Sequence, residues 1–309
     1  MRAVCSHAPQ DRRARSDAPY QRDRMRIASS LRVWLVLGRV SNLPTVWSNC
    51  LAAWLLAGGG PWERFAVVCL GATLLYTGGM FLNDAFDVQF DCKYRPERPI
   101  PSGGISRRLV WASGSGLLGL GGVLMIPFGT ASAVSALGLL ITIVTYDAIH
   151  KRTFLSPVLM AACRFLLYVM AASAAHSGVN GLVLWRALAL AAYVAGLSCL
   201  ARVESSPGAV GRWPLALLFV PVVLALAIGA ESGLAVWILA VGFVVWVFWS
   251  LRGGLWQEKP NFGAGVAGLL AGIVLVDWLA VVGAGEEMSL VFAGLFLLAK
   301  LTQRLAPAT

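Results

Sequence analysis

The sequence is poor in charge, in histidine and in paired cysteines. Only 13% of its 309 residues are charged, whereas 58% are hydrophobic, and histidine occurs three times. This balance lies far from that of an ordinary soluble domain. The six cysteines are scattered and form no CxxC pair, which excludes the usual spacing of a zinc site. These shortages indicate a membrane protein.

The sequence also lacks a basic domain of the soluble kind, although its net charge is +10. A nucleic-acid-binding protein gathers its cations on one folded face, but here they lie in short segments between apolar runs, so we expect no nucleic-acid partner. Residues 1–30 hold many arginines among polar residues and are predicted to be a disordered, basic cytoplasmic tail. No apolar stretch typical of a cleaved signal peptide precedes Leu31, and Met25 is an alternative start.

What the sequence does contain is a series of apolar runs, each long enough to cross a hydrocarbon core about 30 Å thick. Such runs favour helices over barrel strands, because a helix satisfies its own backbone groups in lipid. The predicted spans are 32–57, 63–90, 107–127, 131–149, 154–176, 182–203, 213–230, 234–252 and 263–283, and a further run is 287–304. The sequence therefore predicts an all-α polytopic membrane protein. Residues 31–304 would form one transmembrane domain of nine helices, or ten if the last run also spans.

The cations between these runs are distributed unevenly, and cytoplasmic loops of membrane proteins are enriched in Lys and Arg. Loops after odd-numbered spans hold little beyond Arg64 and Arg186. Loops after even-numbered spans hold Lys93, Arg95, Arg98, Arg107, Arg108, Lys151, Arg152, Arg212, Arg252 and Lys259. This asymmetry predicts that the N-terminus and the even-numbered loops face the cytoplasm. Lys300 and Arg304 would lie there too if 287–304 spans.

Glycine is frequent inside the apolar runs and is densest in the third. Small residues let helices approach closely in lipid, so a tightly packed bundle is one interpretation. The alternative is that the glycines merely reflect membrane composition. The run contains Gly114, Gly116, Gly119, Gly121 and Gly122.

Three aspartates follow the second apolar run in the stretch NDAFDVQFD. At about 100° per residue, Asp84, Asp87 and Asp91 fall within roughly 60° of one another on a helix. Three carboxylates on one face would repel, so the cluster calls for a cation. Oxygen ligands from these residues and Asn83 favour Mg²⁺ or a similar hard ion, and Mg²⁺ commonly binds through one or two carboxylates plus substrate phosphate oxygens.

A loop rich in cations and prolines comes next, KYRPERPIPSG. Lys93, Arg95 and Arg98 could bind phosphate oxygens, arginine through its planar fork and lysine as a point charge. The prolines would stiffen the loop and hold these cations near the carboxylates. A metal-bridged diphosphate is therefore the predicted ligand class. The alternative is a solvated acidic helix end followed by a loop that anchors the protein by positive charge.

A second polar cluster, YDAIHKR, closes the fourth span. Tyr146 and His150 are four residues apart and can share a helix face. Lys151 and Arg152 could bind phosphate or only anchor the helix end, and His150 could be structural. Charged or polar residues inside spans are costly and are expected to face a polar cavity. The members of that set are Arg39, Asn42, Arg164, Arg202, Glu204 and Asp277, of which Arg164 and Asp277 could form a structural pair.

These motifs resemble the UbiA superfamily of intramembrane prenyltransferases. The resemblance rests on Asn83, Asp84, Asp87 and Asp91 followed by the run 95–103, RPERPIPSG, and extends to Arg39, Asn42 and the segment 146–152. It covers roughly residues 31–283. It implies a helical bundle around a central cavity in a bacterial inner membrane, open to the cytoplasm and to lipid. The ligands would be an isoprenyl diphosphate, Mg²⁺ and a small aromatic or lipid acceptor, and the oligomeric state stays open.

The resemblance also implies roles for the site residues. Arg39, Asp84, Asp87 and Lys151 would be catalytic, and Asn83, Asp84, Asp87, Asp91 and Glu204 would hold metal. The diphosphate would be bound by Lys93, Arg95, Arg98, Lys151, Arg152 and Arg202. The acceptor or cavity residues would be Asn42, Tyr146, His150 and Arg164.

The sixth span departs from the family pattern, which usually carries a second acidic motif there. This chain reads SCLARVESS, with Glu204 as the only acid and Arg202 as a cation. Together with SNLPTVWSN, GGMFLND and YDAIHKR, the departure resembles a divergent subgroup, the UbiA-like protein of the bacterial Ebo cluster. That likeness implies an alternative to catalysis: a membrane protein that binds or translocates a metabolite precursor.

Overall fold

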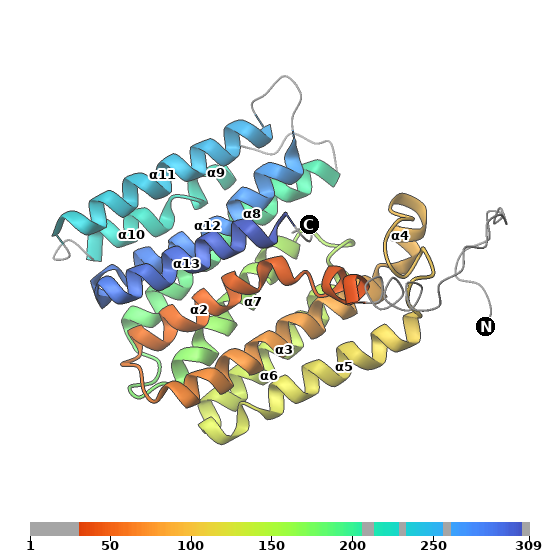
Figure 1. The fold of residues 1–309 in the computed structure, drawn as a ribbon, viewed down its shortest axis with the longest axis horizontal. Coiled ribbons are helices and arrows are strands. Elements are labelled where there is room, and N and C mark those ends of the chain that lie inside the picture. Colours follow the sequence, from red (N-terminus) through yellow and green to blue (C-terminus); the bar gives the residue numbers. More distant parts are fainter. Residues whose placement is uncertain (1–30, 206–212, 229–232, 256–260, 305–309) are drawn as a thin grey trace, which may run out of the picture.

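The computed structural model describes residues 31–205, 213–228, 233–255 and 261–304 (Figure 1). Within these ranges the chain is helical and contains no strand. Residues 31–37 form a first helical segment. The longer helices that follow are α2 (Leu43–Leu56), α3 (Trp62–Phe86), α5 (Arg107–Val123), α6 (Thr130–Ile149), α7 (Ser156–Ser173), α8 (Gly181–Ser205), α11 (Gly233–Leu255), α12 (Phe262–Ala280) and α13 (Glu286–Thr302). The shorter elements are η1 (Val40–Asn42), α4 (Val88–Tyr94), η2 (Ile126–Phe128), α9 (Trp213–Leu217), α10 (Val220–Ile228) and η4 (Val282–Ala284).

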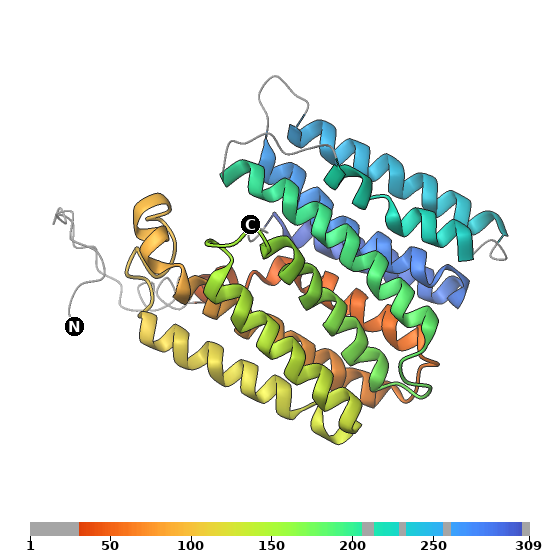
Figure 2. The ribbon, with the colours of Figure 1, turned by 180° about the vertical axis from the view of Figure 1, so that it is seen from behind.

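The long helices lie side by side in two groups, with α3, α5, α6 and α7 on one side and α8, α10, α11, α12 and α13 on the other (Figure 2). Helix α2 lies between them and packs against α3, α7, α12 and α13. Large apolar side chains remain exposed on the outer helices, for example Leu137 and Val241. An exposed apolar surface of this kind suits lipid and not water.

Seven of the described helices are long and apolar enough to cross a membrane: α3, α5 with η2, α6, α7, α8, α11 and α12. The predicted total of nine or ten spanning helices is therefore not confirmed. The seventh predicted span is split into α9 and α10, because Pro221 has no N–H to donate to the preceding turn. Helix α13 has 17 residues and packs against α2, α12 and η1.

The first predicted span, 32–57, is also interrupted. Arg39 adopts a left-handed backbone conformation with φ 41°, and η1 separates it from α2. Pro44 in the first turn of α2 disfavours a continuous helix before it. Left-handed backbone is uncommon for a residue that carries a side chain. The break allows Arg39 to extend toward the end of α3.

The second predicted span, 63–90, is wrong at its C-terminal end. Helix α3 ends at Phe86, Asp87 lies at the junction, and α4 turns away from the axis of α3 (Figure 1). The prediction that Asp84, Asp87 and Asp91 share one face of one helix is corrected accordingly. They lie on two helices and at the joint between them.

The expected close packing through glycine is found between α3 and α5 and again between α11 and α12, where a Cβ added to Gly254 would lie 2.6 Å from Gly265 Cα. A Cβ atom added to Gly78 of α3 would lie 2.8 Å from the Gly114 carbonyl oxygen of α5. One added to Gly121 would lie 2.9 Å from the Gly71 carbonyl oxygen. The backbones of α3 and α5 therefore approach too closely for larger residues. By contrast, nothing lies within 4 Å of a Cβ added to Gly116 or Gly119.

Candidate diphosphate and acceptor site

Charged residues gather at the C-terminal end of α3, where four separated segments meet. These segments are the break before α2, the α3/α4 junction, the loop after α4 and the end of α6. We call this group, Arg39, Asp84, Asp87, Asp91, Arg98, His150 and Lys151, the charged cluster. Each of its aspartates contacts a cationic side chain from outside α3 and α4, and Asp87 also contacts a histidine.

Arg98 joins two of the three aspartates. Its Nη1 lies 2.8 Å from Asp84 Oδ1 and 3.4 Å from Asp91 Oδ2. Both carboxylates are almost fully buried. Burial raises the pKa of Asp91, and the neighbouring Asp84 and Asp87 act in the same direction, although Arg98 opposes them. The cation therefore occupies a position on which two buried carboxylates converge.

Asp87 is bound by the two residues that directly follow α6. Lys151 Nζ lies 2.8 Å from Asp87 Oδ1, and His150 Nε2 lies 3.4 Å from Asp87 Oδ2. Burial alone would raise the pKa of Asp87, but the hydrogen bonds from His150 and Lys151 outweigh it and leave that pKa below its usual value. The His150 ring stacks on Tyr146 with centroids 4.8 Å apart, so the predicted i, i+4 pair on α6 is present.

Arg39 reaches the same cluster from the chain break. Its Nη2 donates to Asn83 Oδ1 at 3.3 Å and lies 3.6 Å from Asp84 Oδ1. The Tyr76 hydroxyl donates to the Arg39 carbonyl oxygen at 3.4 Å, which ties the left-handed residue to α3. Asn83 in turn donates through Nδ2 to Asp147 Oδ1 at 3.1 Å. Both ends of the Asn83 amide are therefore engaged by protein.

The cluster fits a hard divalent cation through its carboxylates. No three His, Cys, Asp or Glu side chains among the described residues already converge as a metal site. However, Arg98 stands as a positive charge between Asp84 and Asp91, and a divalent ion that needs only one or two carboxylates could take that place. Arg98 would then be released to contact phosphate oxygens. Asp87 is held separately, by Lys151 and His150.

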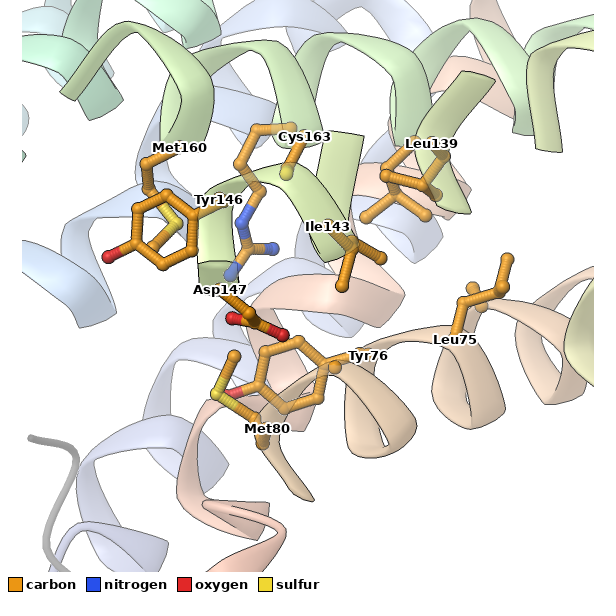
Figure 3. A pocket seen from close by; sticks show the side chains of 13 residues that line it. Leu75, Tyr76, Met80, Leu139, Ile143, Tyr146, Asp147, Met160 and Cys163 are labelled. Atoms are coloured by element: carbon orange, nitrogen blue, oxygen red, sulfur yellow. The ribbon is translucent and has the colours of Figure 1, made fainter. Parts of the chain in front are cut away.

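A cavity of about 80 Å³ lies between α3, α6 and α7 (Figure 3). Its wall is mostly apolar, with Leu75, Met80 and Ile143 among the lining residues. Its polar members are Tyr76, Tyr146, Asp147, Cys163 and Arg164. Of the four residues predicted for the acceptor or cavity, Tyr146 and Arg164 line this cavity, whereas His150 belongs to the charged cluster and Asn42 is buried at the chain break.

Arg164 and Asp277 do not contact each other as an ion pair; they are joined through Asn49. Arg164 Nη1 donates to Asn49 Oδ1 at 2.7 Å, and Asn49 Nδ2 donates to Asp277 Oδ2 at 2.7 Å. Thr45 and Ser48 complete the network: Arg164 Nη2 donates to Thr45 Oγ1 at 3.0 Å, and Ser48 Oγ donates to Asp277 Oδ2 at 2.6 Å. The predicted structural pair is therefore a bridged one that ties α2, α7 and α12 together.

Four predicted phosphate-binding cations lie outside the cluster. Lys93, Arg95 and Arg152 are exposed, and Arg202 donates to the Phe154 carbonyl oxygen at 3.1 Å. Glu204 belongs to α8, but its side chain lies outside the described residues.

Two site residues were missed by the sequence reasoning. Asp147 is buried at 3% exposure, lines the cavity and is bound to Asn83. Tyr76 lines the cavity and holds Arg39. In the sequence, Asp147 is an acidic residue just before the basic end of an apolar run. Tyr76 is a tyrosine two helical turns before Asn83. Neither is specific, because their roles depend on which helices pack beside them.

Comparison with known protein families gives a match to the UbiA prenyltransferase family over residues 41–261. The chain is 35% identical over 107 residues to a 4-hydroxybenzoate octaprenyltransferase of Paracidovorax citrulli, which covers 33% of this chain and 31% of that protein. It is 31% identical over 157 residues to a digeranylgeranylglyceryl phosphate synthase of Ignicoccus hospitalis, covering 50% of this chain and 52% of that protein. A longer match, to a 4-hydroxybenzoate octaprenyltransferase of Acidovorax ebreus, is 28% identical over 231 residues and covers 70% and 74%. The match to the Paracidovorax protein thus spans about a third of the length of that protein.

Solved structures share the fold at low identity. A structure reported for digeranylgeranylglyceryl phosphate synthase in membranes superposes with a TM-score of 0.58 at 18% identity. The match covers 87% of this chain and 98% of that one. A UbiA homologue from Archaeoglobus fulgidus, bound to GPP and Mg²⁺, gives a TM-score of 0.50 at 14% identity, with 88% and 97% covered.

Proposed function

Because the chain belongs to the UbiA prenyltransferase family and is a multi-pass membrane protein, we propose that it transfers an isoprenyl group from a prenyl diphosphate to an aromatic or lipid acceptor. The reaction would depend on Mg²⁺, as the Archaeoglobus homologue bound to GPP and Mg²⁺ suggests. We place it at the face of the bundle that carries the charged cluster. Localisation to a bacterial inner membrane with that face in the cytoplasm is part of the proposal.

The observation that carries the proposal is the pairing inside the charged cluster. Asp84, Asp87 and Asp91 are held by cations from three segments far apart in sequence. A divalent ion on the carboxylates would free Arg39, Arg98 and Lys151, which could then bind an anionic ligand. Carboxylates for a metal and cations for phosphate are the two halves of a metal-diphosphate site. A solvated helix end would not need buried aspartates.

The chain's own residues have separate tasks in this reaction. Arg39, Arg98 and Lys151 would hold the diphosphate and stabilise the charge that develops on it as the allylic carbon–oxygen bond breaks and its electron pair leaves with the diphosphate. Mg²⁺, held by Asp84 and Asp91 with Asp87 beside it, would neutralise the same charge. The rings of Tyr76 and Tyr146 line the adjoining cavity, where an aromatic face can stabilise a positive carbon. The acceptor then forms the new bond to that carbon and loses a proton.

The cavity sets a condition on this mechanism. Its volume of about 80 Å³ is below the roughly 300–1,000 Å³ of ordinary ligand sites. A prenyl chain would therefore need the helices around it to part, or would extend into lipid. The Met80 and Met160 side chains in the wall are flexible and can adjust to an occupant.

The test uses purified full-length protein in lipid nanodiscs with Mg²⁺, geranyl diphosphate and either an aromatic or a lipid acceptor. Pyrophosphate release and prenylated product are measured together. We expect Asp84→Ala and Asp87→Ala to abolish both, whereas Glu97→Ala, an exposed acid in the neighbouring loop, should leave them unchanged. Undiminished turnover in the aspartate variants would refute the proposal.

A second candidate function is favoured by the sixth predicted span. Arg202 near the end of α8 is bound to the Phe154 carbonyl oxygen, outside the charged cluster, and Glu204 is the only acid in that stretch. A site with one acidic half could bind a diphosphate or a metabolite precursor without cleaving it, or translocate it. Metal-dependent binding of geranyl diphosphate without any product would support this function, and product in the assay above would exclude it.

A further inference from the structure

The joint between α3 and α4 is held from outside by α5, a helix that supplies no residue of the charged cluster. Arg107 at the start of α5 donates through Nε to the Ala85 carbonyl oxygen at 3.0 Å. One turn further along α5, the Trp111 ring meets the Phe86 ring edge to face, with centroids 4.8 Å apart. Ala85 and Phe86 are the two residues that separate the first two aspartates of the cluster. The contacts from α5 therefore fall between those aspartates.

The end of a helix needs donors for its carbonyl groups. The last four C=O groups of a helix have no N–H partner inside that helix, and a cation near them is favoured by the helix dipole. In α3 the Asn83 carbonyl oxygen accepts from the Asp87 N–H at 3.0 Å, and Arg107 serves the carbonyl of Ala85. Within its own helix Arg107 lies in the first turn, where a positive charge is unfavourable. The contact with the end of α3 is therefore what favours a cation at this position.

A small apolar core lies at the joint and is separate from the main core of the bundle. It joins the first helical segment, α3, α4, the loop after α4, and α5. Its buried members are Leu37, Phe81, Ala85, Val88, Ile100 and Val110. Four of these five segments also carry or adjoin residues of the charged cluster, and α5 is the one that does not. Helix α5 thus takes part in the support of the cluster without belonging to it.

We infer that Arg107 is a positioning residue for the charged cluster. By donating to the Ala85 carbonyl oxygen it fixes the bend between α3 and α4, and thereby the placement of Asp84 relative to the aspartates beyond the joint. This role requires no contact between Arg107 and the ligand. The inference rests on the proposed function for the identity of that ligand, a prenyl diphosphate with a divalent cation.

Two substitutions separate a donor to the carbonyl from a positive charge. In Arg107→Gln the side-chain amide nitrogen is as many bonds from the backbone as Nε of arginine, so it can donate to Ala85 without carrying a charge. Arg107→Met keeps a long unbranched side chain but has no donor. Arg108→Met removes the exposed neighbouring cation of the same helix and is the matched control.

The first measurement is the binding of geranyl diphosphate with Mg²⁺ to full-length protein in nanodiscs, by calorimetry. Arg107→Met should weaken this binding by about tenfold or more, because residues that hold metal ligands from outside commonly change metal affinity by that factor when they are lost. Arg107→Gln and Arg108→Met should bind as the wild-type protein does.

The second measurement needs no ligand. Hydrogen–deuterium exchange is followed over residues 83–94 of the metal-free protein in the same nanodiscs. A joint that has lost a hydrogen bond opens more often, so its amide groups exchange faster. The segment should therefore exchange faster in Arg107→Met than in the wild-type protein, and at the wild-type rate in Arg107→Gln and Arg108→Met.

Wild-type binding or wild-type exchange in Arg107→Met would overturn the inference. A loss of binding in Arg107→Gln as large as that in Arg107→Met would also overturn it, because the charge and not the donor would then matter. An equal loss in Arg108→Met would show that only the general positive charge of this helix end counts.

Failure of the proposed function looks different. In that case binding and exchange depend on Arg107 as expected, but no pyrophosphate or prenylated product is formed. If the wild-type protein bound no geranyl diphosphate, the proposed function would fail, and exchange at the joint would still decide the role of Arg107.

Discussion

Asp87 and Lys151 show how single residues divide the work of the charged cluster. Lys151 Nζ contacts Asp87 at 2.8 Å, whereas its neighbour Arg152 forms no ion pair with any described residue. Lys151→Ala should therefore weaken the binding of geranyl diphosphate with Mg²⁺ by about tenfold or more, because a charge-assisted hydrogen bond is lost. Arg152→Ala should change the affinity much less. Calorimetry on both variants checks this, and equal effects would show that the lysine acts only through the general positive charge of the helix end.

Asp277 offers a second comparison between residues, in this case for stability. Its carboxylate compensates the buried Arg164 charge through Asn49. Asp277→Leu alone should lower the free energy of unfolding by about 3–5 kcal/mol, because the arginine is left buried without a counter-charge. The double variant Arg164→Met with Asp277→Leu should recover much of that loss. Unfolding in mixed micelles measures both, and a double variant as unstable as the single one would contradict a charge-compensation role.

At the scale of elements, two interruptions build the site. The break at Arg39 and the junction at Asp87 each interrupt a span that was predicted to be continuous. Each interruption brings residues of its segment into the charged cluster. Apolar length alone predicted both spans as continuous, since a run of hydrophobic residues does not reveal where the backbone changes direction. Pro44 was the visible marker of the first break. The second has no proline or glycine to mark it.

The sequence predicts close packing through glycine but does not identify α3 and α5 as the helices that pack this way. Gly78→Ala should lower the thermal unfolding temperature, because the added Cβ meets the backbone of α5, and overpacking costs about 1–3 kcal/mol. Gly119→Ala, on the open side of the same helix α5, should leave it unchanged or raise it, since alanine favours helix by about 1 kcal/mol. If both variants behaved alike, the close approach of the two backbones would be wrong.

For the whole molecule, the distribution of cations predicts that the loop after α4 faces the cytoplasm. Arg95 lies in the loop after α4, and Val179 lies in the connection between α7 and α8 at the other end of these helices. In intact bacterial cells, Val179→Cys should react with a membrane-impermeant maleimide, whereas Arg95→Cys should react only after the membrane is opened. The parent protein, with its native cysteines, gives the background labelling. The reverse pattern would place the charged cluster on the outer face.

The sequence by itself determined the membrane class, the helical architecture, the family and the two motifs of the charged cluster. These follow from local quantities: the length of apolar runs, the positions of cations between them, and the spacing of aspartates and arginines. Only the tertiary structure decided which cation meets which carboxylate, that Arg164 reaches Asp277 through Asn49, and that Asp147 lines the cavity while bound to Asn83. The physical reason is that these contacts join α2, α3, α6, α7 and α12. Pairings between helices depend on where the helices break and how closely they pack. The hydrophobic periodicity of a single helix determines neither.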